Sequence, residues 1–87
     1  MPKGKIIVDT GAKKALVNNH SSLLPKGIID VTGNFLISQI VDIVDENDNL
    51  LARGIVNYSS DEIKLIMGHD SQDIESILHY KDYDEVI

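Results

Sequence analysis

The stretch SSLLPKGIIDVTGNF, residues 21–35, carries the strongest structural signals in this sequence. Pro25 and Gly27 predict a turn, because proline fixes its own φ angle and glycine adopts backbone conformations that other residues avoid. The apolar, β-branched residues that follow predict a strand over 27–31, with Asp30 on its solvent side. We therefore expect a shaped loop that positions a strand.

The residues before this stretch predict a strand followed by a helix. KIIV at 5–8 is a short apolar, β-branched run of the kind found in buried strands. Thr10 stands where a helix cap is expected, and Ala12, Ala15 and Leu16 then fall on one helix face.

Three further strands are predicted downstream. The alternating pattern at 39–44 and the run LLARGIVNY at 50–58 predict two paired strands, and the polar residues DENDN at 45–49 predict the hairpin loop between them. Gly54 lies inside the second of these strands, where a glycine indicates a bulge, a barrel corner or a close backbone approach. The final EVI, residues 85–87, predicts the beginning of another strand.

Two short helices are also predicted in the second half of the chain. The helix at 59–68 has a capping box, with Ser59 as the cap and Glu62 three residues later. Asp70 or Ser71 is expected to cap the next helix, whose apolar stripe consists of Ile74, Ile77 and Leu78. Four or five strands with short helices predict one mainly β domain over residues 1–87, a small mixed barrel or sandwich.

Composition excludes several classes of protein. The 87 residues include no cysteine, so disulfides and cysteine-ligated metal sites are impossible. No apolar run resembles a signal peptide or a membrane span, so we expect a cytoplasmic protein with no membrane partner. The net charge of −6 argues against general nucleic-acid binding. The charge is segregated, however: the first 30 residues hold five lysines and two aspartates, and the rest of the chain holds three basic and twelve acidic residues.

The basic first third therefore provides one candidate binding surface. Its lysines could meet on one face with the backbone amides around the turn and contact the phosphates of RNA. The candidate nucleic-acid-binding residues are Lys13, Lys14, Ser22, Lys26, Gly27 and Arg53. The plainer alternative is that these lysines are simply solvated, since no aromatic side chain lies near them to stack on a base.

No catalytic, cofactor or metal constellation is predicted. DENDN resembles the start of a calcium loop, but Leu50 stands where that loop needs glycine and Val56 where it needs glutamate. No serine has the surroundings of a nucleophile, and no glycine-rich phosphate loop is present. The histidines have no metal-binding spacing; they are His20, His69 and His79.

Several motifs together resemble one known family. They are GAKKAL at 11–16, SSLLPKGI at 21–28, V-x-G-x-F at 31–35, LARGIVNYSSDEI at 51–63, and SQDIESIL at 71–78 followed by Tyr80. This series closely resembles the C-terminal PUA domain of bacterial glutamate 5-kinases. The resemblance spans nearly the whole chain and implies a PUA-like pseudobarrel of strands with short helices.

The resemblance also implies a function. Such kinases transfer the γ-phosphoryl group of ATP to glutamate in proline biosynthesis, using Mg²⁺ in a separate N-terminal amino-acid-kinase domain that is absent here. It therefore implies a non-catalytic fragment with a regulatory or assembly role, whose last strand looks truncated. Its expected partners are the kinase domain of the parent chain, a further copy in a homo-oligomer and, as the alternative function, structured RNA.

Some positions carry particular expectations from the family pattern. The resemblance makes Leu23 and Leu24 core residues, while Ser22 and the proline and glycine of the turn shape the loop. The chain departs from the pattern at Ser38, where the family usually has glycine in a Gly-Asp pair, and at His79, where it again usually has glycine. These departures leave the backbone geometry of both turns open.

Overall fold

The computed structural model describes residues 1–19 and 21–87, so the prediction for His20 lies outside the described residues. The elements are β1 (Gly4–Val8), α1 (Thr10–Asn19), a 3₁₀ turn (Pro25–Gly27), β2 (Ile28–Gly33), β3 (Ile40–Val44), β4 (Leu50–Ile55), α2 (Ser60–Ile66), a second 3₁₀ turn (Ser71–Asp73) and α3 (Ile74–Leu78). The strands predicted at 5–8, 27–31, 39–44 and 50–58 are confirmed, although β4 ends three residues early.

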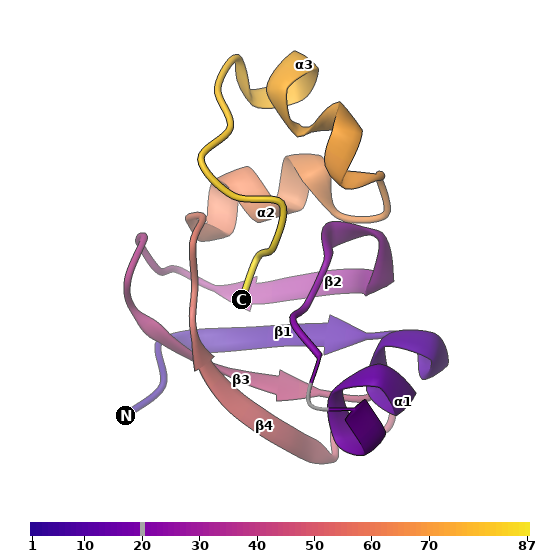
Figure 1. The fold of residues 1–87 in the computed structure, drawn as a ribbon. Helices are drawn as coiled ribbons and strands as arrows, with labels where there is room; N and C mark the ends of the chain where they lie inside the picture. Colours follow the sequence, from indigo (N-terminus) through magenta and orange to yellow (C-terminus); the bar gives the residue numbers. More distant parts are fainter. Residues whose placement is uncertain (20) are drawn as a thin grey trace.

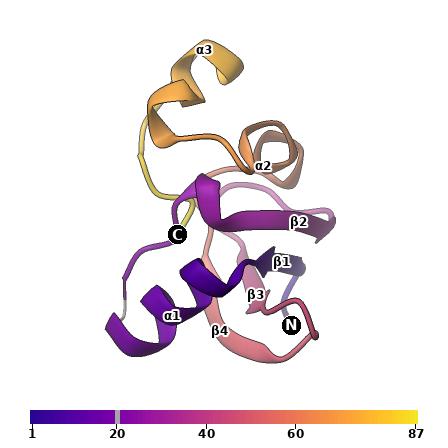
Figure 2. The ribbon, with the colours of Figure 1, turned by 90° about the vertical axis from the view of Figure 1, so that its right-hand side faces the viewer.

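The four strands form one mixed sheet in the order β2-β1-β3-β4 (Figure 1). β1 pairs antiparallel with β2 and parallel with β3, and β3 pairs antiparallel with β4 through the predicted hairpin. Helices α2 and α3 stack beyond the β2 side of the sheet, whereas α1 lies near the end of β1 from which it emerges (Figures 1 and 2). The mainly β fold with short helices is confirmed.

Inward-facing and outward-facing residues alternate along the strands, and the inward-facing ones form the core. Ile6 and Val8 of β1 are fully buried, and Ile43 of β3 is the register partner of Ile6 on the same face. Leu23 is also buried in this core, but Leu24 is 47% exposed. The expectation that both leucines of the loop fill the core is therefore wrong for Leu24, because adjacent residues in an extended segment point in opposite directions.

The last residues close the core without forming a strand. Val86 is fully buried; its N–H donates to the carbonyl of Leu23 at 2.8 Å, and its carbonyl accepts from the N–H of Asn57 at 2.8 Å. The predicted strand at 85–87 is wrong, because these residues bridge two separate segments instead of running along one ladder. A Cβ atom on Gly54 would lie 2.7 Å from the side chain of Ile87, so among the three alternatives predicted for that glycine the structure favours a close approach to its backbone.

The helix caps agree with the sequence only in part. The capping box of α2 is present, since Ser59 accepts from the N–H of Glu62 at 3.2 Å and Glu62 accepts from the N–H of Ser59 at 2.9 Å. Thr10 is not the cap of α1, because the side chain of Asp9 accepts from the N–H of Ala12 at 2.8 Å. The one-residue error arises because both side chains can cap a helix.

The cap predicted for the last helix is also wrong. Asp70 makes no side-chain capping bond at the 3₁₀ turn that precedes α3. Ser71 instead donates its hydroxyl to the carbonyl of Asp84 at 2.9 Å. Both polar side chains therefore bind residues outside the helix, and Asp70 forms a long-range ion pair described below.

Both departures from the family pattern lie at positions with left-handed backbone. Ser38 has φ of 73° and His79 has φ of 67°. Ser38 occupies a tight turn in which the N–H of Gln39 donates to the carbonyl of Leu36 at 3.2 Å, and His79 follows the last turn of α3. Glycine adopts this conformation without the steric cost that a Cβ atom brings.

We expect Ser38→Gly and His79→Gly each to raise the free energy of unfolding. The relief of left-handed strain exceeds the entropy that glycine adds to the unfolded chain, so the net gain should be about 0.5–1 kcal/mol each. Urea unfolding followed by circular dichroism measures it. As a control, Glu75→Gly in the right-handed backbone of α3 should lower stability by about 1 kcal/mol. A loss of stability in both test variants would contradict the expectation.

Candidate nucleic-acid interface

Helix α1 places two of the candidate residues next to each other. The carboxylate of Asp9 caps the helix, and Lys13 and Lys14 follow one turn later. The helix approaches the loop before β2 very closely, since a Cβ atom on Gly27 would lie 2.6 Å from the Cβ of Ala12. The structure therefore gives Gly27 a packing role at this helix, independent of any ligand.

A first hollow of about 210 Å³ lies between α1 and the 45–49 hairpin loop. Lys13 and Lys14 line one side of it, and Asp45 and Glu46 line the other. Lys13 donates to the carboxylate of Asp45 at 3.0 Å. One of the two adjacent lysines is therefore already paired with a carboxylate inside the fold.

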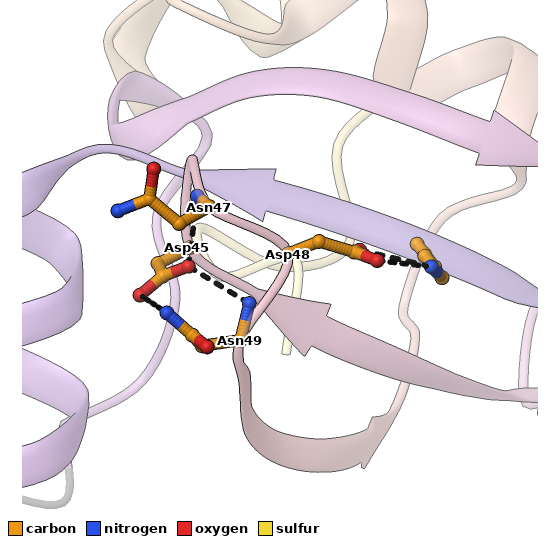
Figure 3. A network of polar contacts seen from close by, with 5 residues as sticks. Asp45, Asn47, Asp48 and Asn49 are labelled. Carbon is orange, nitrogen blue, oxygen red and sulfur yellow. Dashed lines mark hydrogen bonds and ion pairs between the residues drawn. The ribbon is translucent and has the colours of Figure 1, made fainter.

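Asp45 is the centre of the hairpin loop (Figure 3). One carboxylate oxygen accepts from the backbone N–H groups of Asn47 and Asn49, each at 2.9 Å, and the other accepts from the Asn49 amide at 3.1 Å and from Lys13. The bonds from Asn49, then that from Lys13, lower the pKa of the Asp45 carboxyl well below its usual range. The predicted hairpin is confirmed, and its aspartate organises the turn.

This network predicts a pH-dependent contribution to stability. Because the pKa of Asp45 is lowered in the fold, its charge stabilises the protein above the ordinary pKa of 3.8, and this contribution declines as the pH falls below that value. Asp45→Asn should therefore be less stable than wild type at neutral pH, and the difference should shrink below about pH 4. Urea unfolding at several pH values measures it.

Glu46→Gln, the exposed neighbour, is the matched control and should show a difference near zero throughout. A constant difference for Asp45→Asn down to about pH 2 would show that the carboxylate charge is not what stabilises the turn.

A second hollow of about 320 Å³ lies on the other side of Asp9, between α1 and residues 22–27. Its lining is mostly apolar, and Asp9, Ser22 and Lys26 provide its polar side chains. The ammonium group of Lys26 lies 3.3 Å from the carboxylate of Asp70, and both side chains are mostly exposed. Ion pairs of this kind contribute little to stability, and they exchange readily with other charged partners.

Arg53 lies apart from these hollows. It projects from β4, lines neither hollow, and its Nε donates to the carboxylate of its cross-strand partner Asp42 at 2.7 Å. Lys5 of β1 is also paired, with the carboxylate of Asp48 in the hairpin loop at 2.9 Å. Among the candidate cations, Lys14 alone has no carboxylate within ion-pair distance in the part of the chain that the structure describes.

Sequence reasoning missed these carboxylate partners. The pairing of Arg53 with Asp42 has a signal, since both lie on the outward positions of two predicted strands joined by a hairpin. The pairing of Lys26 with Asp70 has none, because the two residues are far apart in the sequence. The described residues contain no group of three or more side chains suited to a metal ion.

The side chains of Ser59 and Ser60 have structural roles. Ser59 caps α2, and Ser60, which is buried, exchanges hydrogen bonds with the backbone of Phe35: it accepts from the N–H at 3.1 Å and donates to the carbonyl at 3.2 Å. The predicted capping role of Ser59 is confirmed.

No helix among the described residues is long and apolar enough to cross a membrane.

A mixed sheet flanked by short helices, with one hollow on each side of the capping residue Asp9, defines a small β-rich module. The family model described as the PUA domain matches residues 4–78. The chain belongs to the PUA domain family, and the predicted PUA-like pseudobarrel is confirmed.

Two solved structures support the same fold. A PUA domain from Aeropyrum pernix K1, in a tartrate complex, aligns with a TM-score of 0.68 and 27% identity over 71% of this chain and 34% of that chain. NSun6 from Pyrococcus horikoshii aligns with a TM-score of 0.63 and 20% identity over 72% of this chain and 16% of that chain.

Curated relatives are much more similar in sequence. The glutamate 5-kinase of Caldanaerobacter subterraneus subsp. tengcongensis is 51% identical over 84 residues, which are 97% of this chain. That of Trichlorobacter lovleyi is 48% identical over 86 residues, or 99% of this chain. The chain spans 23% of the length of each, and the matched region is the C-terminal PUA domain of those enzymes. The predicted resemblance is confirmed.

Proposed function

We propose that this chain is the non-catalytic accessory domain of a glutamate 5-kinase, acting in proline biosynthesis in the cytoplasm, where it regulates or assembles the kinase. The observation that carries the proposal is the match of nearly the whole chain, at up to 51% identity, to the C-terminal part of such enzymes. ATP, Mg²⁺ and glutamate would then be bound by the separate amino-acid-kinase domain. A homo-oligomer of the kinase would bring several copies of this domain together.

The test is a chimera of the Caldanaerobacter kinase in which this chain replaces the matched C-terminal segment. We expect the isolated chain to transfer no phosphoryl group from ATP to glutamate. The chimera should match the native kinase in rate, in molar mass by light scattering and in inhibition by proline, whereas a kinase lacking the segment should differ in at least one of these. A segment-free kinase identical to the native one in all three would reject the accessory role.

RNA binding is the second candidate function, and the observation that favours it is the grouping of Lys13, Lys14, Ser22 and Lys26 around the two hollows beside Asp9. The partners of these lysines are carboxylates on other elements, which phosphate groups would have to displace. Arg53 would have to contact a different part of the same RNA.

For this second function we expect fluorescence anisotropy to detect a complex with a stem-loop RNA at low salt. Each lysine that contacts a phosphate makes the slope of log affinity against log salt more negative by about one unit. Lys14→Glu should weaken binding and make the slope less negative by about one unit. Lys64→Glu, on the exposed face of α2, is the control and should leave both unchanged. No binding of wild type at low salt would exclude this function.

A further inference from the structure

Four large apolar side chains, each about half or more exposed, belong to segments that meet at one end of the sheet. Leu36, Ile37, Ile40 and Ile55 are 68%, 51%, 49% and 59% exposed, respectively. We call this group the strand-end patch. Other exposed apolar residues, such as Leu65 on α2, are dispersed over separate elements. A grouped apolar surface rimmed by polar residues indicates a site of protein contact, whereas single exposed apolar residues are normal.

The strand-end patch has a fixed geometry. Ile40 and Ile55 are cross-strand partners of β3 and β4, so their side chains lie side by side on the outward face of the sheet. The turn that carries Leu36 and Ile37 is joined to the end of β4 by a hydrogen bond of 2.9 Å from the N–H of Ser38 to the carbonyl of Val56. A surface held by backbone hydrogen bonds loses little conformational entropy when it binds.

The N-terminal segment runs directly beside this patch. The N–H of Lys3 donates to the carbonyl of Ile40 at 2.9 Å, and Figure 1 places the N-terminus at the same end of the molecule as the start of β3. Lys3, Leu36 and Gln39 also line a hollow of about 360 Å³ that extends to the beginning of α2. A polypeptide segment joined to the N-terminal side of residues 1–3 would therefore lie next to the patch and to this hollow.

We infer that the strand-end patch is the surface on which the preceding part of a glutamate 5-kinase packs against this domain, an inference that rests on the proposed function. In the relatives the matched region is C-terminal, so the greater part of each enzyme precedes it and arrives beside the patch. Interfaces between domains of one chain commonly bury 600–1,500 Å² in total. A second copy is a poorer occupant, because two chains of net charge −6 repel each other.

Amide hydrogen exchange in the chimera tests this inference. In the wild-type chimera, amides at 36–40 and 54–56 should exchange about tenfold more slowly than in the isolated chain, because the docked kinase part covers them. The double variant Ile40→Lys with Ile55→Lys should abolish this protection. Leu65→Lys, at an equally exposed position of α2, is the control and should retain it.

The outcomes separate the inference from the function. Equal exchange at these amides in an active chimera of native mass would overturn the inference and leave the accessory role intact. A chimera that behaves like the segment-free kinase would reject the accessory role and, with it, the inference. A dimer of the isolated chain in light scattering that the double variant converts to a monomer would assign the patch to self-association and overturn the proposed occupant. Unchanged melting of the isolated double variant excludes misfolding as the cause of lost protection.

Discussion

Val86→Asp is expected to unfold most of the protein at neutral pH. The side chain is fully buried in the hydrophobic core, and an aspartate there would lose apolar burial and place a charged carboxylate among apolar side chains. Such a change costs about 4 kcal/mol or more, whereas the total stability of a chain of this length is about 4–13 kcal/mol. Loss of amide dispersion in a proton–nitrogen NMR spectrum would report the unfolding directly.

Two milder variants serve as controls. Val86→Ala removes two methyl groups and should cost about 2 kcal/mol, which leaves the protein folded but shifts its urea midpoint. Glu85→Gln changes the neighbouring residue. The side-chain amide of Asn57 donates to the backbone carbonyl of Glu85 and not to its carboxylate, so this variant should have almost no effect. If Val86→Asp unfolded at the wild-type urea midpoint, residues 85–87 would not belong to the core.

Tyr58→Ala should have the second largest effect. The ring is fully buried, its centroid lies 6.2 Å from that of Tyr80, and its hydroxyl donates to the carbonyl of Tyr83. Burial raises the pKa of Tyr58, so the phenol keeps its proton and remains a donor. Removing the whole ring should lower the free energy of unfolding by about 3–5 kcal/mol.

Tyr58→Phe separates packing from hydrogen bonding. It keeps the ring in the core but removes the hydroxyl that fixes the 80–87 segment, and should cost about 1–2 kcal/mol. Urea unfolding of both variants gives the two contributions. A cost for the phenylalanine variant equal to that for alanine would mean that the hydroxyl, and not the ring, accounts for the stabilisation.

Local signals in the sequence predicted most of the fold. The strand at 5–8 and the hairpin loop at 45–49 depend mainly on the residues within those segments, and both predictions are confirmed. The capping box of Ser59 and Glu62 is similarly local. Residues 85–87 were assigned wrongly, because whether an apolar end becomes a strand depends on partners such as Leu23, more than 60 residues away in the sequence.

The candidate site was less predictable for the same reason. Lys13 and Lys14 were identified as neighbours on a helix, which periodicity can show. Their surroundings depend on which acidic residues the fold brings near, and Asp45 reaches Lys13 only because the hairpin folds against α1. The strand-end patch was also invisible in the sequence, because outward apolar residues of a strand resemble the inward ones until the register of the sheet is known.

The position of Val86 has a consequence for synthesis of the protein. Its hydrogen-bond partners, Leu23 and Asn57, belong to parts of the chain that leave the ribosome much earlier. The sheet can begin to pair while translation continues, but the core stays open on one side until residue 86 has emerged from the exit tunnel. During that interval the apolar core is exposed to chaperones and proteases, so the emergence of Val86 determines when the core becomes protected.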